Sequence, residues 1–207
     1  MALTLVALVV ATVANISTFN PRQKLDETLD NLERAVRFSK DEALLRNRIV
    51  RIAIKLNTDP QSFTVEYAPD GEFVLPGQYL RASEASELLS EEALAAKKKA
   101  IYKSFQPVKE FAEEVQEISD QIQIIAVASS LTNELVTTDE ASIFFYPTGE
   151  KDGALIVLSN VDEMATLEVE PFLDEFKRDY FRIESTSNDL YEFQLSQAKS
   201  FFEDWLK

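Results

Sequence analysis

The chain has 207 residues, of which 45% are hydrophobic, so it is long enough to fold as one domain with a buried core. Its 36 Asp and Glu outnumber its 21 Lys and Arg, and the formal net charge of −15 argues against a nucleic-acid partner, whose phosphates it would repel. It contains no His, no Cys and four Gly, which excludes Ser–His–Asp and Cys–His catalytic sites, zinc-type sites, disulfides and Gly-rich nucleotide-binding loops.

The charge is distributed unevenly along the chain. Residues 22–55 contain nine basic and six acidic residues, whereas residues 56–207 contain 12 basic and 30 acidic residues. The first part therefore has a net charge of +3 and the second a net charge of −18. An acidic surface of this kind favours solubility and cationic or polar partners, and its simplest interpretation is solvated charge.

The first predicted element is the apolar run ALTLVALVVATVA at residues 2–14, which has no charge, no Pro and no Gly. With the uncharged residues after it, a helix of about 18 residues would cover roughly 27 Å, just short of a ~30 Å hydrocarbon core. Three interpretations fit the run: a signal-peptide core cut after Ala14, a buried strand or helix of a soluble domain, and a membrane-anchoring helix. We favour the anchor, because a charged amphipathic helix follows without a linker.

The next elements are a helix, a strand and a hairpin. Helical spacing of apolar residues predicts an amphipathic helix that starts near Pro21 and ends at about Arg46 or Asn47. Alternation over Ile49–Leu56 predicts a strand of a half-buried sheet. Two further strands, Ser62–Tyr67 and Glu72–Leu75, flank Pro69-Asp70-Gly71, which is typical of a hairpin turn. The apolar positions of the helix are Leu25, Leu29, Leu32, Val36, Ala43 and Leu44.

The middle of the chain, about residues 83–119, is predicted to be a two-helix insertion. Ser90 is a candidate cap for the first helix, and Pro107 separates the two. The second helix would carry its apolar face at Val108, Phe111, Ala112, Val115 and Ile118.

The last part returns to strands and ends in a helix. Strands are predicted at residues 121–128, 141–146, 154–159, 166–170 and 180–183, with PTGEKDG as the hairpin between the second and third of these. A C-terminal helix at about 188–207, with Ser187 as its candidate cap, carries a wide aromatic stripe that is either core or an interface. The stripe comprises Tyr191, Leu195, Ala198, Phe202 and Trp205, with Leu190, Phe193 and Phe201 beside it. The chain thus divides into an N-terminal rod (1–20) and an α+β head (21–207).

Two carboxylate clusters raise the question of catalysis or calcium binding. One contains Glu163, Glu168, Glu170, Asp174, Glu175 and Asp179, and the other Asp139, Glu140, Glu150 and Asp152. A carboxylate pair is able to hydrolyse a glycoside, and hard oxygens bind calcium. Because no D-x-D-x-D-G pattern is present, we interpret both clusters as solvated loop charge, and we assign no catalytic residue, no cofactor and no metal ligand.

The order of these elements resembles a known family. Thr4-Leu5-Val6-Ala7-Leu8-Val9-Val10, then R-x-x-K-x-E-A-L-x-R-x-R over residues 37–48, the strand IVRIAI and the later FFYPTGEKDGALIVL together resemble a type IV pilin-like protein. The similarity is greatest to the minor pseudopilin H of bacterial type II secretion, and next to FimT-like minor pilins. It covers about residues 3–77 and 121–170.

The resemblance implies a pilin-like fold, in which one long N-terminal helix, an apolar shaft with an amphipathic half, packs on an antiparallel β-sheet head. It implies cleavage between Ala2 and Leu3, methylation of the new N-terminus, and a single-pass bacterial inner-membrane protein with its head in the periplasm. The chain would be a non-enzymatic subunit whose partners are major and minor pseudopilins, the inner-membrane secretion platform and secreted substrate. The implied membrane and assembly residues are Leu3, Leu5, Val6, Ala7, Leu8, Val9, Val10 and Val13.

The sequence departs from the family at two positions and in two segments. Ala2 stands where the family has the Gly that ends its leader, and Ala7 where it usually has a Glu able to pair with a neighbouring N-terminal amine. The tip-most subunit type in these systems also lacks that Glu, so a tip location is compatible with Ala7. The helical insertion and the C-terminal helix have no match in the family.

Three groups of alternatives follow. Arg46, Arg48 and Arg51 at the helix-to-strand junction are either snorkelling side chains or helix C-terminal charge, or else a docking patch for the acidic head of the next subunit. Phe201, Phe202 and Trp205 are further candidate docking residues. The alternative functions are a minor pilin of a type IV pilus, a membrane-anchored periplasmic binding module that does not polymerise, and an anchored hydrolase with two carboxylates.

Overall fold

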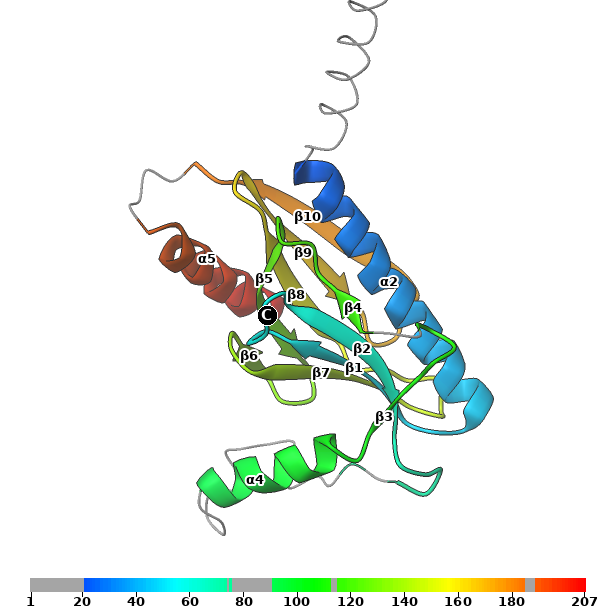
Figure 1. Ribbon diagram of the computed structural model, residues 1–207. Coiled ribbons are helices and arrows are strands. Elements are labelled where there is room, and N and C mark those ends of the chain that lie inside the picture. The colour runs from blue at the N-terminus through cyan, green and yellow to red at the C-terminus, as the bar shows by residue number, and fades with distance from the viewer. Residues whose placement is uncertain (1–20, 74, 76–90, 113–114, 185–188) are drawn as a thin grey trace, which may run out of the picture.

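The computed structural model describes residues 21–73, 75, 91–112, 115–184 and 189–207. Within these ranges the chain is an α+β protein with two antiparallel sheets and a C-terminal helix (Figure 1). The predictions for the N-terminal rod, for Ser90 and for Ser187 concern residues outside the described ones. The α+β class and the antiparallel sheets are confirmed.

Helix α2 (Pro21–Arg46) is the first described element, and its predicted end at Arg46 or Asn47 is confirmed. Its apolar side chains at i, i+4 and i+7 form one buried stripe, with Leu25, Leu29 and Leu32 all fully buried. The helix ends where Asn47 adopts a positive φ of 51°, a conformation that Asn tolerates better than most residues. The amide of Arg48 then donates to the carbonyl of Ala43 (3.2 Å), which satisfies one of the last free carbonyls.

The first sheet is centred on β1 (Val50–Lys55). On one side β1 pairs with β2 (Ser62–Tyr67), and on the other with β7 (Glu140–Phe145), antiparallel in both cases. The far edge of β2 is covered at its two ends by the short strands β3 (Gln106–Pro107) and β4 (Gln116–Glu117). We call this sheet A.

The second sheet, sheet B, has the strand order β10-β9-β8-β5-β6, with every neighbouring pair antiparallel. All six residues of its middle strand, β8, are buried. The strands are β5 (Gln123–Ser129), β6 (Glu134–Val136), β8 (Ala154–Ser159), β9 (Glu163–Val169) and β10 (Phe176–Arg182).

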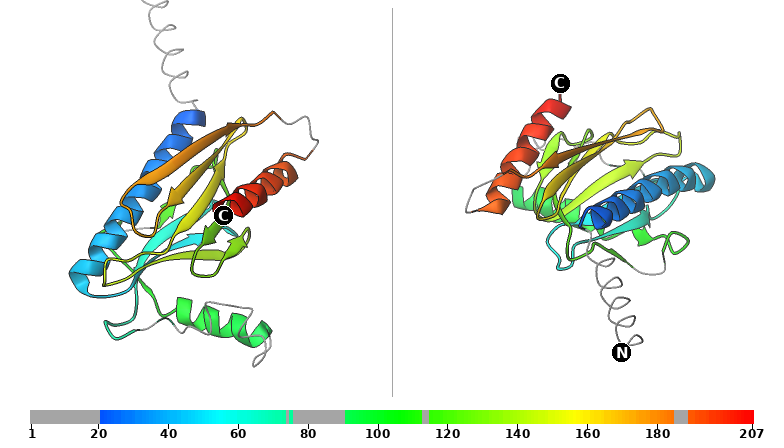
Figure 2. Two further views of the ribbon diagram at one scale, coloured as in Figure 1. Left: turned by 180° about the vertical axis from the view of Figure 1, so that it is seen from behind. Right: turned by 90° about the horizontal axis from the view of Figure 1, so that it is seen from above.

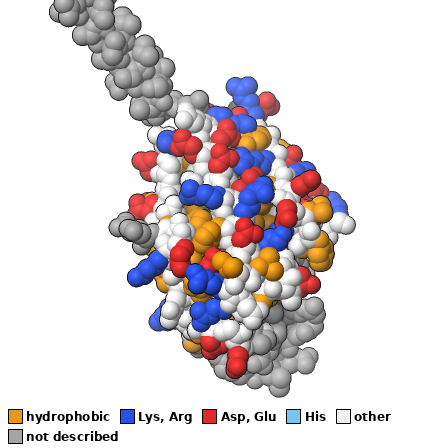
Figure 3. Space-filling view, turned by 90° about the vertical axis from the view of Figure 1, so that its right-hand side faces the viewer, with side chains coloured by type: hydrophobic (Ala, Val, Ile, Leu, Met, Phe, Trp, Pro, Cys, Tyr) orange, Lys and Arg blue, Asp and Glu red, His pale blue; other side chains and the backbone are white. Residues whose placement is uncertain are grey.

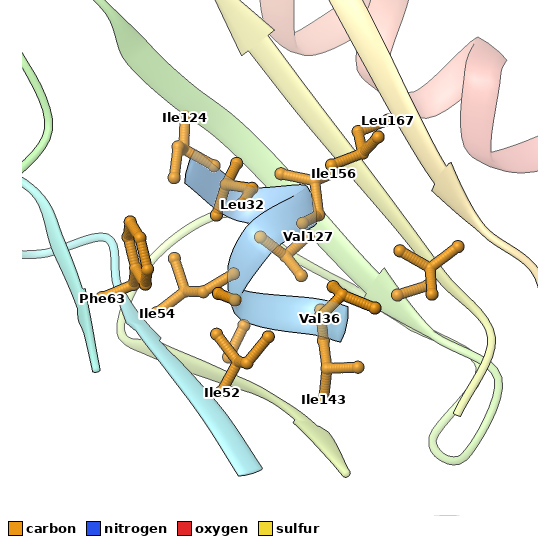
Figure 4. Close-up of a cluster of buried hydrophobic side chains, with 14 of the residues drawn as sticks. Leu32, Val36, Ile52, Ile54, Phe63, Ile124, Val127, Ile143, Ile156 and Leu167 are labelled. Carbon is orange, nitrogen blue, oxygen red and sulfur yellow. The ribbon is translucent and has the colours of Figure 1, made fainter. Parts of the chain in front are cut away.

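Helix α2 lies between the two sheets and contributes to a core shared by both. Figure 4 shows Leu32 and Val36 of α2 among side chains of sheet A and sheet B. The labelled partners are Ile52, Ile54, Phe63 and Ile143 from sheet A, and Ile124, Val127, Ile156 and Leu167 from sheet B. Helix α5 (Leu190–Trp205) covers the opposite face of sheet B, as the two views of Figure 2 show. The inner strands β5, β8 and β9 of sheet B are therefore buried on both faces, which explains their continuous apolar sequences.

The outer face of sheet A is also covered. Helix α4 (Glu91–Tyr102) leads into a segment whose Phe105 packs against Ile49, Ala68 and Phe144. The strand alternation predicted for Ile49–Leu56 is confirmed, but the more polar face is buried rather than half-exposed.

The prediction of a second helix in the insertion is wrong. Residues 106–107 and 116–117 are instead edge strands of sheet A, and the apolar Val108 and Ile118 are buried beside them. Pro107 occupies β3, where the lack of an N–H is tolerated because the strand is at an edge. Apolar spacing over ten residues is compatible with a helix and with an extended segment that packs on the core. The edge of β2 is available for pairing, and the ends of this segment pair with it, so the segment is extended.

The predicted hairpin between residues 141–146 and 154–159 is also wrong. Both strands exist, but β7 belongs to sheet A and β8 to sheet B. A tight turn does form, with the Tyr146 amide donating to the Glu150 carbonyl (2.9 Å). The chain returns along the end of β7 only as far as Asp152, whose amide donates to the Phe144 carbonyl (2.9 Å), and then crosses to sheet B.

Two smaller predictions are corrected at chain turns. The Asp70 side chain accepts from the Glu72 amide (3.0 Å), yet Glu72, Phe73 and Leu75 form no strand, so this turn joins no hairpin. Helix α5 is capped by Asp189, whose carboxylate accepts from the Glu192 amide (3.0 Å).

Candidate functional site

The predicted assembly residues Leu3, Leu5, Val6, Ala7, Leu8, Val9, Val10 and Val13, and the predicted processing site at Ala2 and Leu3, lie outside the described residues. Within the described part of the chain, no helix has both the length and the apolar character needed to cross a membrane. The remaining site predictions fall on described residues.

The three junction arginines point to three different environments. The Arg46 side chain is about half exposed (49%), and its guanidinium donates to Glu42 (2.8 Å) and Glu110 (3.2 Å). Arg48 donates to the backbone carbonyl of Pro69 (2.7 Å) and lies over the Tyr67 ring. Both therefore stay near the surface with contacts inside the chain.

Arg51 is buried, with 2% of its surface exposed. Its guanidinium donates to the carboxylate of Glu66 (2.6 and 2.8 Å) and to Glu140 (2.9 Å). It also donates to Ser142 (3.1 Å) and to the backbone carbonyl of Tyr102 (3.0 Å), so all five N–H groups have acceptors. The Tyr102 and Phe105 rings lie 4.4 and 4.6 Å from its central carbon. Arg51 fastens the segment after α4 to sheet A and leaves no group free to dock a partner.

Glu42 shows how the end of α2 is tied to sheet A. Burial opposes its ionisation, but hydrogen bonds from the Tyr67 hydroxyl and the Arg46 guanidinium outweigh burial and lower the pKa of the Glu42 carboxyl. Burial and the same hydrogen bond raise the pKa of the Tyr67 hydroxyl.

The basic residues of α2 mostly meet acidic residues of the same chain. Arg22 pairs with Glu163 at 2.7 Å, and Lys40 pairs with Asp174. Acidic residues of α2 are paired as well: Asp30 (2.7 Å) and Glu33 (2.6 Å) accept from Arg178 of β10. Figure 3 shows this side of the molecule, where basic and acidic side chains are interspersed. Several basic residues of α2 are thus paired with acidic side chains of the same chain.

The C-terminal aromatic stripe packs inward. Ala198 is fully buried against sheet B, and Leu195, Phe202 and Trp205 are partly buried beside it. Phe201 stacks on Phe181 of β10, with ring centres 4.3 Å apart. Phe201, Phe202 and Trp205, predicted as candidate docking residues, therefore already contact sheet B. Tyr191 stays 41% exposed.

The carboxylate clusters do not form a metal centre within the described residues, where no group of three acidic ligands comes together. Several members are salt-bridged, including Glu140 to Arg51 and Asp179 to Lys177. Asp152 departs from the expectation of solvated charge, because it is 5% exposed. Burial raises the pKa of its carboxyl to about 6, although it accepts hydrogen bonds from the Phe144 amide (3.0 Å) and the Tyr146 hydroxyl (3.1 Å).

A small cavity of about 140 Å³ lies between α2 and the β9–β10 turn, lined in part by Arg37, Lys40, Lys151 and Asp174. Lys151 is 6% exposed and donates to the carbonyl of Leu173 (2.6 Å). Burial, followed by repulsion from Lys40, lowers the pKa of the Lys151 amine. Lys40 is paired with Asp174, and Arg37 lies over the Phe176 ring, so all three cations of this cavity have contacts within the chain.

A larger cavity of about 370 Å³ opens at the Pro21 end of the head, between the start of α2, the start of β5, the β8–β9 turn and the start of α5. Its volume lies in the range of ligand-binding pockets. We call it the amide cavity, because Gln121, Asn160 and Gln194 all line it. The other lining residues are Pro21, Asp120, Ile122, Gln123, Ser159, Val161, Leu190 and Tyr191.

The sequence pattern does not predict the amide cavity. Gln121 falls at the start of the predicted strand 121–128, and no predicted site includes Asn160 or Gln194. One signal was present: Gln194 falls midway between Leu190 and Ala198 at i+4 spacing, so an amide interrupts an otherwise apolar helical stripe.

Comparison of the chain with protein-family models, with curated proteins and with solved structures gives no match. The resemblance to pilin-like proteins therefore stays a prediction from the sequence.

Proposed function

We propose that this protein is a non-enzymatic assembly subunit of the pilin-like type, most specifically a minor pseudopilin of a type II secretion pseudopilus. In this role it is held in the bacterial inner membrane by its N-terminal segment, with the head in the periplasm. It joins other pseudopilins through that segment and helps to form or prime the tip of the assembly. The alternative within the same class is a minor pilin of a type IV pilus.

One observation carries the proposal: α2 is both the direct continuation of the uncharged N-terminal run and the central element of the head. In sequence, no charged residue stands between residue 2 and Pro21, where α2 begins. In the fold, Leu29 and Leu32 of α2 are fully buried between the two sheets. A head that is built around such a helix suits a subunit whose N-terminal segment packs with others.

The physical argument for assembly lies in the apolar run itself. A helix that is apolar on all sides is equally well solvated by lipid or by similar helices, so it is able to exchange one for the other. Packing and not water exclusion would then hold the helices together. The α2 face shown in Figure 3 mixes charges of both signs, which suits polar contact between neighbouring heads.

The test is photocrosslinking of the full chain in its native cells. A photoreactive phenylalanine analogue replaces Val9 in the uncharged run, or Asn57 in the exposed turn after β1 as the matched control. We expect Val9 adducts with proteins that begin with a similar uncharged segment, identified by mass spectrometry, and none of these from Asn57. The same spectra should show a mature N-terminus at Leu3.

The alternative functions give different results. In one, the chain is present in the membrane at its normal level while Val9 forms no adduct with a protein that begins with a similar uncharged segment. That result would indicate an anchored binding module that does not polymerise. A chain that appears only in the soluble fraction would overturn the proposal altogether.

A further inference from the structure

Two residues that line the amide cavity each carry a buried polar atom without a partner among the described residues: Asn160 Nδ2, a donor, and Gln121 Oε1, an acceptor. Both residues line the cavity, and Asn160 is 5% exposed. An unsatisfied buried polar group costs about 1–3 kcal/mol, so each atom would gain from a ligand that supplies its missing partner.

The orientation of the Asn160 amide follows from its other contacts. Its Oδ1 accepts from the backbone amides of Asp162 (2.8 Å) and Glu163 (2.8 Å) in the β8–β9 turn. Nitrogen cannot accept these bonds, so exchanging the two ends of the side chain would break both. The free atom is therefore the donor.

The neighbouring polar groups are already used. Gln194 Nε2 donates to the Ser159 hydroxyl (2.7 Å), and that hydroxyl donates to a backbone carbonyl. No Lys or Arg is among the described residues that line the cavity, whereas Asp120 is. A ligand needs one acceptor for Asn160 and one donor for Gln121, and an anionic group is disfavoured. A peptide amide has both groups and no charge.

The same end of the molecule shows this recognition within the chain itself. The Gln61 side chain pairs with both backbone groups of Ile124 on β5: its Oε1 accepts from the amide (2.7 Å), and its Nε2 donates to the carbonyl (3.0 Å). A side-chain amide thus replaces a missing strand next to the amide cavity. The mouth of the cavity adds apolar surface, since Val161 is 68% exposed and Tyr191 is 41% exposed.

We propose that the amide cavity binds an extended peptide segment of a partner protein. Asn160 Nδ2 donates to a main-chain carbonyl of the segment, Gln121 Oε1 accepts from a main-chain N–H, and Val161 and Tyr191 contact an apolar side chain. Gln121 is half-buried and has a long flexible side chain, so its rotation opens the site to the segment. This proposal does not depend on the assembly function.

The experiment is NMR titration of the ¹⁵N-labelled full chain in detergent, observing the side-chain NH₂ signals of Asn160, Gln121 and Gln194. The probe is N-acetyl-Ala-Val-Ala-amide. Its matched control is N-acetyl-Ala-Pro-Ala-amide, which lacks the central N–H. We expect saturable shifts of all three signals by the first probe, with a Kd of about 1 mM, and binding by the second that is about tenfold weaker.

Two variants separate the roles of the two atoms. Asn160→Asp keeps the two acceptor contacts of the turn and removes the donor, and Gln121→Met removes the acceptor at similar size. Each should weaken binding about tenfold. Asn57→Asp, at an exposed position outside the cavity, introduces the same charge as Asn160→Asp and should bind like the unmodified chain.

Two results would overturn the proposal. One is the absence of shifts at saturating probe, which would leave a cavity filled only by water. The other is that the two probes bind equally well, or that both variants bind the first probe as tightly as the unmodified chain does. Either outcome would show that Asn160 and Gln121 do not recognise a peptide amide.

Discussion

The fold buries both Arg51 and Asp152, but among the described residues only Arg51 is paired with side chains of opposite charge. Arg51 is paired with Glu66 and Glu140, and every N–H group of its guanidinium has an acceptor. No cation is paired with Asp152 among the described residues; its contacts are a backbone amide and two hydroxyls. Burial therefore dominates its titration and raises the pKa of its carboxyl to about 6.

This difference predicts a measurable pH dependence of stability. The pKa of the Asp152 carboxyl is higher in the folded chain (about 6) than its ordinary value of 3.8, so the folded state binds the proton more tightly. The favourable contribution is complete below the ordinary pKa and is lost as the pH rises through the folded pKa. We expect the free energy of unfolding to fall by up to about 3 kcal/mol from this group between about pH 4 and pH 6.

The variant Asp152→Asn isolates that contribution, because its amide stays neutral and is able to keep the contacts to Phe144 and Tyr146. Urea unfolding of the full chain at several pH values gives the free energy of each protein. The difference, variant minus unmodified chain, should rise through this pH window and then level off. Asp139→Asn, at an exposed carboxylate, is the control and should give a flat difference. A flat curve for Asp152→Asn would show that the buried carboxylate costs nothing.

At the scale of elements, the sequence pattern sufficed where the periodicity of one segment determines its type and its end. The bounds of α2 and β2 follow from their own periodicity. The partners of β7 and β8 cannot be derived from their own sequences. A short turn at residues 146–150 is compatible both with a hairpin and with a crossing between the sheets. What selects the crossing is distant: β1 takes the edge of β7, and β5 and β9 take both edges of β8.

Helix α5 gives a prediction at this scale. Ala198 is fully buried where the helix meets β5 and β8, so Ala198→Glu would force a carboxylate into an apolar contact. We expect a loss of about 3 kcal/mol or more in the free energy of unfolding, or failure to fold. Ser200→Glu introduces the same residue on the exposed side of the helix and should change stability by less than about 0.5 kcal/mol. Chemical denaturation followed by Trp205 fluorescence measures both, and equal stabilities would mean that the stripe is not core.

At the scale of the whole molecule, the candidate sites could not be derived from local pattern. The amide cavity combines four segments that are separated by up to about 170 residues of sequence, and each contributes between one and four residues. The burial of Arg51 depends on the segment after α4, which covers a face that the alternation of β1 marks as polar. The uneven charge can be read from the sequence, whereas the ion pairs between α2 and sheet B, such as Arg178 to Glu33, are visible only in the fold.

The position of α2 between two sheets implies that the head unfolds as one unit. Leu32 is fully buried and contacts a core drawn from both sheets, so Leu32→Ala should cost about 2–5 kcal/mol. Hydrogen exchange of β1 reports on sheet A and that of β8 on sheet B, and the variant should accelerate the slowest amides of both by the same factor. Leu45→Ala removes the same atoms from a side chain of α2 that is 75% exposed, and it should leave both rates nearly unchanged. Faster exchange confined to β8 would mean that α2 stabilises sheet B alone. The two sheets would then unfold separately, and the head would not be one cooperative unit.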